Sequence, residues 1–161
     1  MSGLGVHFAL TSDQEEQLLD AVDDDEVMSL VDEVEETIGE RDLVATDKAW
    51  DAIHRCLTDG TLYGDDMPLS LAVLGGEQFH DEDDYIVSYV TVDEVQEVSV
   101  ALSGWDRTRL RERYDAIDPG DYDGLKGDDD FSYTWENFVE LSTFFTEAAL
   151  SKKAVIFTVD Q

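Results

Sequence analysis

Three stretches of the chain have the hydrophobic patterns of β-strands. Residues 4–10 alternate between apolar side chains and small or polar ones, which predicts a strand with one apolar face. Residues 85–90 form a run rich in β-branched and aromatic residues, which also predicts a strand. Residues 154–159 form a continuous, mostly apolar run that is typical of a strand covered on both faces. We therefore expect 154–159 at the centre of a sheet that also contains 4–10.

Between the strands, apolar residues recur every three or four positions, which is the period of an amphipathic helix. In chain order, the pattern predicts helices over 12–22, 27–39, 48–57, 69–74, 92–102, 107–117 and 133–151. Thr11 with Gln14 and Thr91 with Glu94 have the spacing of capping boxes, and we expect Asp47 and Asp106 to be N-caps. The acidic run 23–26, the segment 80–84 and residues 118–130 are predicted to lie outside helices and strands.

Strands that are far apart in the sequence, with the helices grouped between them, are typical of an α+β protein with one small sheet. The chain of 161 residues contains no internal repeat and no linker-like segment. We therefore predict a single α+β domain over residues 1–161, with several helices around the sheet.

Charge narrows the range of functions. Forty Asp and Glu residues against ten Lys and Arg give a formal net charge of −30. A surface this acidic repels nucleic acid and anionic membranes and attracts basic proteins. Residues 1–47 alone contain 15 acidic side chains and one basic side chain, Arg41. This concentration favours a docking face for a basic protein, although acidic runs are commonly no more than a solvated surface that aids solubility or tolerance of salt.

The predicted docking face lies on and just before the second predicted helix. Its apolar stripe starts at Val27, and the acidic residues precede that stripe or lie on the opposite side of the helix. The residues predicted to bind a partner are Asp23, Asp24, Asp25, Glu26, Asp32, Glu33 and Glu36.

Signatures of catalysis or of cofactor binding are missing from the sequence. It has no Gly-rich phosphate loop, no zinc-ligand spacing and no G-x-S-x-G motif. Asp118, Asp121 and Asp123 resemble part of a calcium loop, but placing Gly124 at the sixth position puts Pro119 at the first, where an EF-hand needs a ligand. We therefore predict no cofactor and no metal.

The expected compartment is the cytoplasm. Cys56 is the only cysteine, so an internal disulfide is impossible, which fits a reducing environment. No segment of the chain has the length of apolar sequence that a membrane span requires, and the first residues do not resemble a signal peptide.

One candidate cleft remains. Trp50 and His54 share a face of the predicted helix 48–57, and with Lys48 and Tyr89 they could line a pocket in which the imidazole acts as a base. The simpler interpretation, which we favour, places His54 in the core. The alternating arginines Arg107, Arg109, Arg111 and Arg113 could bind an anion, although pairing with the chain's own carboxylates is the more common outcome.

Three stretches resemble one known family. They are Gly3-Leu4-Gly5-Val6-His7-Phe8, Asp47-Lys48-Ala49-Trp50-Asp51-Ala52-Ile53-His54 and Pro68-Leu69-Ser70-Leu71-Ala72-Val73-Leu74-Gly75-Gly76. In these segments the chain is similar to the YfbM-like proteins, also called DUF1877. The resemblance extends over almost the whole chain and implies a small bacterial α+β protein. It implies no catalytic residue, because the family has no assigned function.

Two hypotheses about function follow. The first is a non-catalytic acidic protein that neutralises a basic partner, as an immunity protein or an inhibitor of a toxin or enzyme would. The alternative is an enzyme or small-ligand binder that uses the cleft near Trp50, His54 and Tyr89.

Overall fold

A five-stranded antiparallel sheet forms the centre of the protein. The computed structural model describes residues 3–39, 42–63, 66–82, 85–122 and 124–160. The strands lie in the order β2-β1-β5-β4-β3, and every neighbouring pair is antiparallel. Their bounds are β1 Leu4–Leu10, β2 Leu43–Asp47, β3 Glu77–Glu82, β4 Tyr85–Val90 and β5 Ala154–Asp160.

Residues 4–10 and 154–159 are strands of the same sheet, with 154–159 at its centre, as predicted. β5 lies between β1 and β4 and is the middle strand of the sheet. Each residue from Ala154 to Val159 is buried, which explains the lack of alternation in this segment.

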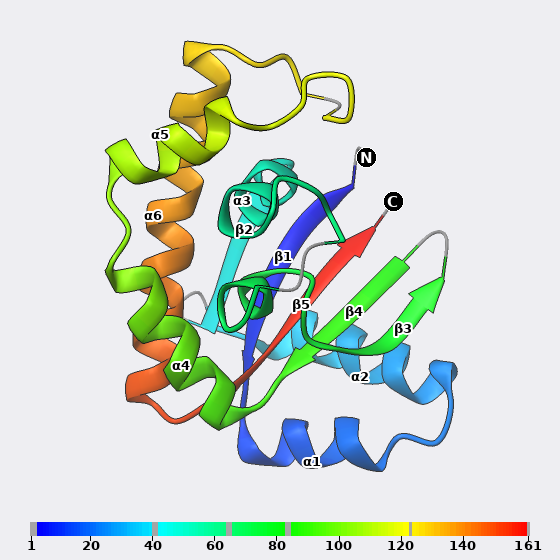
Figure 1. Ribbon diagram of the computed structural model, residues 1–161. Helices are drawn as coiled ribbons and strands as arrows, with labels where there is room; N and C mark the ends of the chain where they lie inside the picture. The colour runs from blue at the N-terminus through cyan, green and yellow to red at the C-terminus, as the bar shows by residue number, and fades with distance from the viewer. Residues whose placement is uncertain (1–2, 40–41, 64–65, 83–84, 123, 161) are drawn as a thin grey trace.

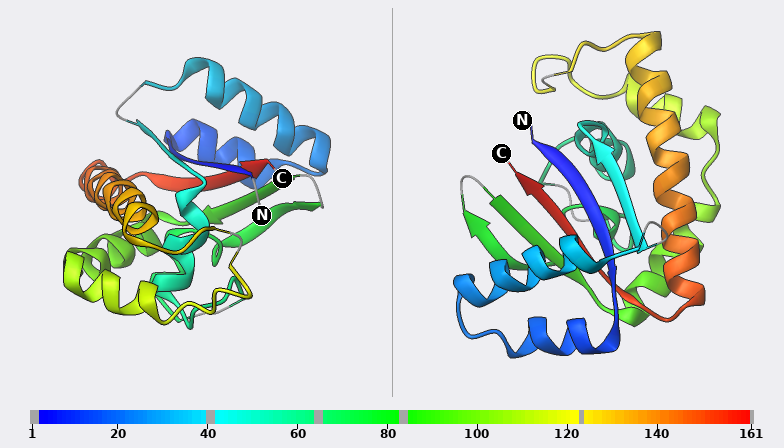
Figure 2. Two further views of the ribbon diagram at one scale, coloured as in Figure 1. Left: turned by 90° about the horizontal axis from the view of Figure 1, so that it is seen from above. Right: turned by 180° about the vertical axis from the view of Figure 1, so that it is seen from behind.

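Helices cover both faces of the sheet, so the molecule has three layers (Figure 2, left). One face carries α1 (Ser12–Asp20) and α2 (Asp24–Thr37), which lie together at the bottom of Figure 1. The opposite face carries α3, the 3-10 helix η2, α4, α5 and α6. Their bounds are α3 Ala49–Leu57, η2 Leu69–Ala72, α4 Val92–Ser103, α5 Arg107–Asp115 and α6 Asp128–Leu150. The α+β class is as predicted.

Each layer of helices has its own hydrophobic core against the sheet. Phe8, Leu18, Val31 and Ile156 belong to the core beneath α1 and α2. The larger core on the other face is aromatic and includes Trp50 and Phe157. Gly5 allows these two rings to approach β1, because a Cβ at this position would lie 2.7 Å from the Trp50 ring.

Helix ends follow the capping signals, with one exception. Thr11 and Thr91 form capping boxes, and Asp106 caps α5. The prediction that Asp47 is an N-cap is wrong, because Asp47 ends β2 with a φ of 49° and α3 has no side-chain cap. The Asp47 carboxylate instead accepts a hydrogen bond from the Tyr133 hydroxyl of α6 at 2.8 Å.

Two acidic segments that were predicted to lie outside helices are helical. Asp23 caps α2, and Asp24, Asp25 and Glu26 form its first turn. Asp128, Asp129 and Asp130 form the first turn of α6, which therefore begins five residues before the predicted start at Tyr133. Carboxylates are favoured at both places because the amino end of a helix carries partial positive charge.

The two edge strands of the sheet, β2 and β3, were not predicted. β2 is only five residues long, and β3 falls partly in the acidic segment 80–84 that was predicted to be a loop; residues 83–84 lie outside the described residues. The apolar residues of β2 (Leu43, Val44 and Ala45) are consecutive, and β3 has a single apolar residue, Phe79, so neither sequence shows a period of two. Pairing with β1 and β4 therefore determines their conformation more than their own sequence does.

Candidate functional site

The layer formed by α1 and α2 has the most one-sided charge in the molecule. We call residues Ser12–Thr37 the acidic layer. It contains twelve acidic side chains and no basic one, and all of these carboxylates except that of Glu15 are on exposed residues. Glu15 is partly buried and accepts a hydrogen bond from the Tyr89 hydroxyl at 2.5 Å. The acidic layer therefore presents a nearly continuous anionic surface to solvent.

All seven residues predicted to bind a partner are exposed in the acidic layer, but two of them also stabilise α2. Asp23 Oδ1 accepts a hydrogen bond from the Glu26 amide at 2.9 Å, and Glu26 Oε2 accepts one from the Val22 amide at 2.8 Å. These carboxylates fix the turn between the two helices. The carboxylates of Asp25, Glu33 and Glu36 have neither a hydrogen bond nor an ion pair within the described part of the chain.

A shallow groove runs between the two helices of the acidic layer. Asp25 and Glu33 line it, and the buried side chain of Leu30 lies at its base. Two apolar side chains of the acidic layer are exposed, Leu19 at 53% and Val22 at 82%. Exposed apolar groups surrounded by charge are the usual composition of a protein interface with a polar rim.

Like charges are crowded along α2. Partial burial and the nearby carboxylate of Asp32 both raise the pKa of Glu35. Lysine and arginine are absent from the acidic layer, so no cation within the layer offsets this repulsion. A basic partner would offset it.

The residues of the predicted cleft do not come together. Trp50 and His54 are 1% exposed in the aromatic core, whereas Tyr89 is buried beneath the acidic layer on the opposite face of the sheet. Lys48 is exposed at the start of α3. The indole Nε1 of Trp50 donates to the Gly3 carbonyl at 2.9 Å, which anchors the ring inside the core. These four positions therefore do not line a common cleft.

Two histidines are buried in a neutral state. Burial lowers the pKa of His7 and of His54 to about 4. The Nε2 of His7 donates to the Ala72 carbonyl at 2.6 Å, whereas neither ring nitrogen of His54 has a hydrogen-bond partner among the described residues. A backbone group of Leu62 near the His54 ring only partly opposes the effect of burial. His54 is thus a core residue, as the favoured interpretation had it.

Cys56 has no features of a reactive thiol. It is fully buried on α3, and burial raises its pKa to about 12. The thiolate is therefore not populated near neutral pH.

The four arginines of α5 contact the chain's own carboxylates, aromatic rings and one backbone carbonyl. Arg111 pairs with Asp115 at 2.9 Å and with Asp128 at 3.1 Å, as expected for internal neutralisation. Arg107 and Arg109 lie over the rings of Phe131 and Trp105, with guanidinium-to-ring distances of 5.1 and 4.2 Å. Arg111 also lies over Phe131, at 5.0 Å, and Arg113 donates a hydrogen bond to the Thr58 carbonyl. Glu112, Asp115 and Asp128 line the same groove as Arg107, so this surface is not a cationic site.

A buried polar network was missed by the sequence analysis. Arg55 Nε lies 2.6 Å from Asp51 Oδ1, and both side chains are 5% exposed. Arg55 also pairs with Asp121 at 2.6 Å. Nearby, the hydroxyls of Tyr114 and Tyr122 both donate to Asp130 Oδ2, at 2.6 and 2.9 Å. The spacing of Asp51 and Arg55, four residues apart on one helix, was the available signal.

This network attaches the segment after α5 to α3 and α6, so we interpret it as structural. Asp121, one of the aspartates that resemble part of a calcium loop, is paired with Arg55, and Asp123 lies outside the described residues. Within residues 3–39, 42–63, 66–82, 85–122 and 124–160, no three His, Cys, Asp or Glu side chains are grouped so that they could hold a metal ion. In the same ranges no helix has the length and apolar character needed to cross a bilayer.

These observations define a class: a three-layer α+β protein with a one-sided acidic surface and two buried cores. The chain belongs to the DUF1877 family, a domain of unknown function, whose model matches residues 1–158. Among solved structures, it is similar to a protein of unknown function, YfbM from Escherichia coli, with a TM-score of 0.72 and 19% sequence identity. That match covers 97% of this chain and 99% of YfbM, so the two share a fold over their whole lengths. No curated protein matches the chain.

Proposed function

We propose that this protein is a non-catalytic binding protein that uses the acidic layer to dock a basic protein. The observation that supports the proposal is the distribution of charge: one whole layer contains twelve carboxylates and no cation. An immunity protein or inhibitor that neutralises a basic toxin or enzyme has this chemistry. Such a complex would form in the cytoplasm.

Electrostatic docking has a definite kinetic signature. Opposite charges at the rim of an interface accelerate encounter by about 10- to 1000-fold and have a smaller effect on dissociation. The effect decreases as salt shortens the Debye length from about 10 Å at 0.1 M to 3 Å at 1 M. The acidic layer should therefore control the association rate constant, and the control should weaken as salt rises.

The test compares two triple charge reversals. In the first variant Asp32, Glu33 and Glu36 of α2 become Lys, which leaves the capping residues Asp23 and Glu26 intact. In the matched control Glu97, Glu112 and Glu136, which are exposed on α4, α5 and α6, become Lys. Both variants change the net charge by the same amount. A difference between their association rate constants therefore shows that the position of the reversed charges matters, and not only the net charge.

The partner is captured from native lysate at low salt, and association is then measured by stopped flow over a salt series. We expect the α2 reversal to slow association by about tenfold or more at 0.1 M salt and the control to slow it much less. Equal slowing by the two variants, or an association rate indifferent to salt, would overturn the proposal. The acidity would then serve solubility or salt tolerance only.

A further inference from the structure

The two edge strands of the sheet, β2 and β3, differ in how well they are protected from pairing with another chain. β3 begins at the exposed Glu77, and its pairing with β4 is interrupted by a bulge between Gln78 and His80. Charges and bulges at an edge strand prevent the addition of further strands. β2 has a bulge only at its Asp47 end, and the stretch Leu43–Ala45 is uncharged and regularly paired with β1.

A groove lies along this unprotected stretch. Leu43, Val44 and Ala45 line one side of it, and the opposite side is α6. Figure 2 (right) shows α6 running beside β2 along that edge of the sheet. The α6 residues in the groove are Val139, Glu140, Thr143, Phe144 and Glu147. They are spaced so that they occupy one face of the helix.

The floor of the groove is apolar and its rim is acidic. Val44 and Phe144 are buried in the aromatic core, and Val139 is 42% exposed. The carboxylates of Glu140 and Glu147 are exposed and have no ion pair in the described part of the chain. A groove between a strand edge and a helix is the geometry in which an extended peptide adds to a sheet through backbone hydrogen bonds.

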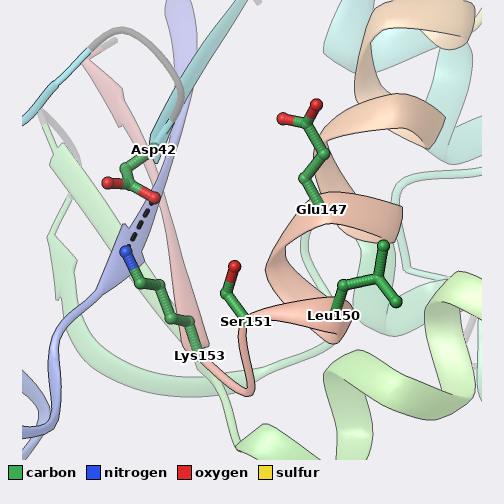
Figure 3. A pocket seen from close by; sticks show the side chains of 5 residues that line it. All are labelled: Asp42, Glu147, Leu150, Ser151 and Lys153. Carbon is green, nitrogen blue, oxygen red and sulfur yellow. Dashed lines mark hydrogen bonds and ion pairs between the residues drawn. The ribbon is translucent and has the colours of Figure 1, made fainter.

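Among the described lysines and arginines, none forms an ion pair with this rim. Glu147 also lines the adjoining pocket in Figure 3, where Lys153 extends towards Asp42 rather than towards α6. Lys153 Nζ lies 2.9 Å from Asp42 Oδ1. Lys153, which directly precedes β5, is therefore already paired, and within the described residues Glu147 has no ion pair.

We propose that the groove between β2 and α6 binds an extended basic segment of a partner protein, which adds as a sixth strand next to β2. Its backbone pairs with Leu43–Ala45, its apolar side chains face Val139 and Phe144, and its lysines or arginines face Glu140 and Glu147. Electrostatic repulsion disfavours a second copy of this chain as the occupant, because each copy has a net charge of −30. The inference rests on the proposed function only for the sign of the partner's charge.

The probe is a capped ten-residue peptide of alternating Lys and Val. A matched peptide with N-methylated valines keeps the charge but loses backbone donors. Binding is followed by the backbone amide resonances of the protein. We expect shifts confined to residues 43–47 and to 139–147 of α6, and binding weaker by about tenfold or more for the methylated peptide.

Charge reversal separates this site from the acidic layer. Glu140→Lys with Glu147→Lys should weaken binding of the Lys-Val peptide by about tenfold, whereas the Asp32, Glu33 and Glu36 reversal should leave its shifts at β2 in place. Glu97→Lys with Glu112→Lys is the control for net charge and should have little effect.

Three results would overturn the inference. In the first, the peptide shifts the amide resonances of α2 and not those of β2, which would favour docking at the acidic layer alone. In the second, the Lys-Val peptide and its N-methylated form bind with equal affinity, which would show that charge attracts the peptide without strand pairing. The third is a concentration-dependent shift of the β2 amides without peptide, because the occupant would then be a second copy.

Discussion

At the scale of single residues, buried polar groups have structural roles in this protein. His7, His54, Asp51 and Arg55 are each at most 4% exposed. Asp51 and Arg55 pair with each other, and His7 donates a hydrogen bond to the Ala72 carbonyl. Functional positions are therefore sought among the exposed groups.

The two buried histidines should titrate far below the ordinary value. Their pKa in the folded chain is about 4, against 6.5 for an unperturbed imidazole. The unfolded chain binds these protons between pH 6.5 and 4 and the folded chain does not, so their contribution to stability is lost as the pH falls through this window. NMR titration of the imidazole Hε1 resonances should give midpoints near pH 4. A midpoint near 6.5 for His54 would mean that its ring is hydrated.

Removal of the His54 ring should destabilise the fold. We expect His54→Ala to lower the free energy of unfolding by about 1–3 kcal/mol, because a side chain that is 1% exposed leaves a cavity in the aromatic core. Denaturant unfolding measures the change. A neutral effect would instead show that the His54 ring does not contribute to the packing of this core.

Arg55 should be the most sensitive charged position. Arg55→Met leaves the Asp51 carboxylate buried without its cation and should cost about 3–5 kcal/mol of unfolding free energy. Asp51→Asn in the same chain should restore much of that loss. Asp121→Asn serves as the control, since the side chain of Asp121 is 56% exposed and its pair with Arg55 contributes about 1 kcal/mol or less. Equal costs for Arg55→Met and Asp121→Asn would contradict this view of the network.

At the scale of helices and strands, the same acidic residue type has different roles along α2. Asp23 accepts the amide hydrogen bond of an N-cap, whereas Asp32 lies in mid-helix beside Glu35 and adds to like-charge repulsion. Position relative to the helix end decides whether a carboxylate stabilises the element.

Two alanine substitutions in α2 should therefore have opposite effects on stability. Asp23→Ala should lower the free energy of unfolding by about 1 kcal/mol, the usual loss for an N-cap. Asp32→Ala should raise it by about 0.2–0.5 kcal/mol, since it removes a like-charge neighbour three residues from Glu35. Chemical denaturation of both variants at low salt is the measurement. If both substitutions changed the free energy of unfolding in the same direction, the N-cap role of Asp23 would not explain the difference between the two positions.

At the scale of the whole molecule, net charge opposes folding. A chain with a charge of −30 repels itself most when it is compact, and added salt screens that repulsion. We expect the thermal midpoint to rise when NaCl is increased from 0.1 M to 1 M. The Asp32, Glu33 and Glu36 reversal should show a smaller rise, because part of the repulsion has been removed. A midpoint that falls with salt would mean that ion pairs outweigh repulsion.

The sequence by itself determined the elements whose patterns come from burial along one segment. The three predicted strands, both capping boxes and the central place of β5 follow from local periodicity and from the unbroken run at 154–159. The uneven distribution of acidic residues was also visible, because charge is a property of composition.

Only the tertiary structure decided which residues meet. β2 and β3 are strands because β1 and β4 pair with them, and the groove beside β2 exists because α6, about ninety residues later in the chain, runs alongside that strand. The same long-range packing separates Tyr89 from Trp50 and His54, since the sheet lies between the two cores. Sequence periodicity shows that a side chain is buried, but which core receives it depends on strand order, which is set by contacts between distant segments.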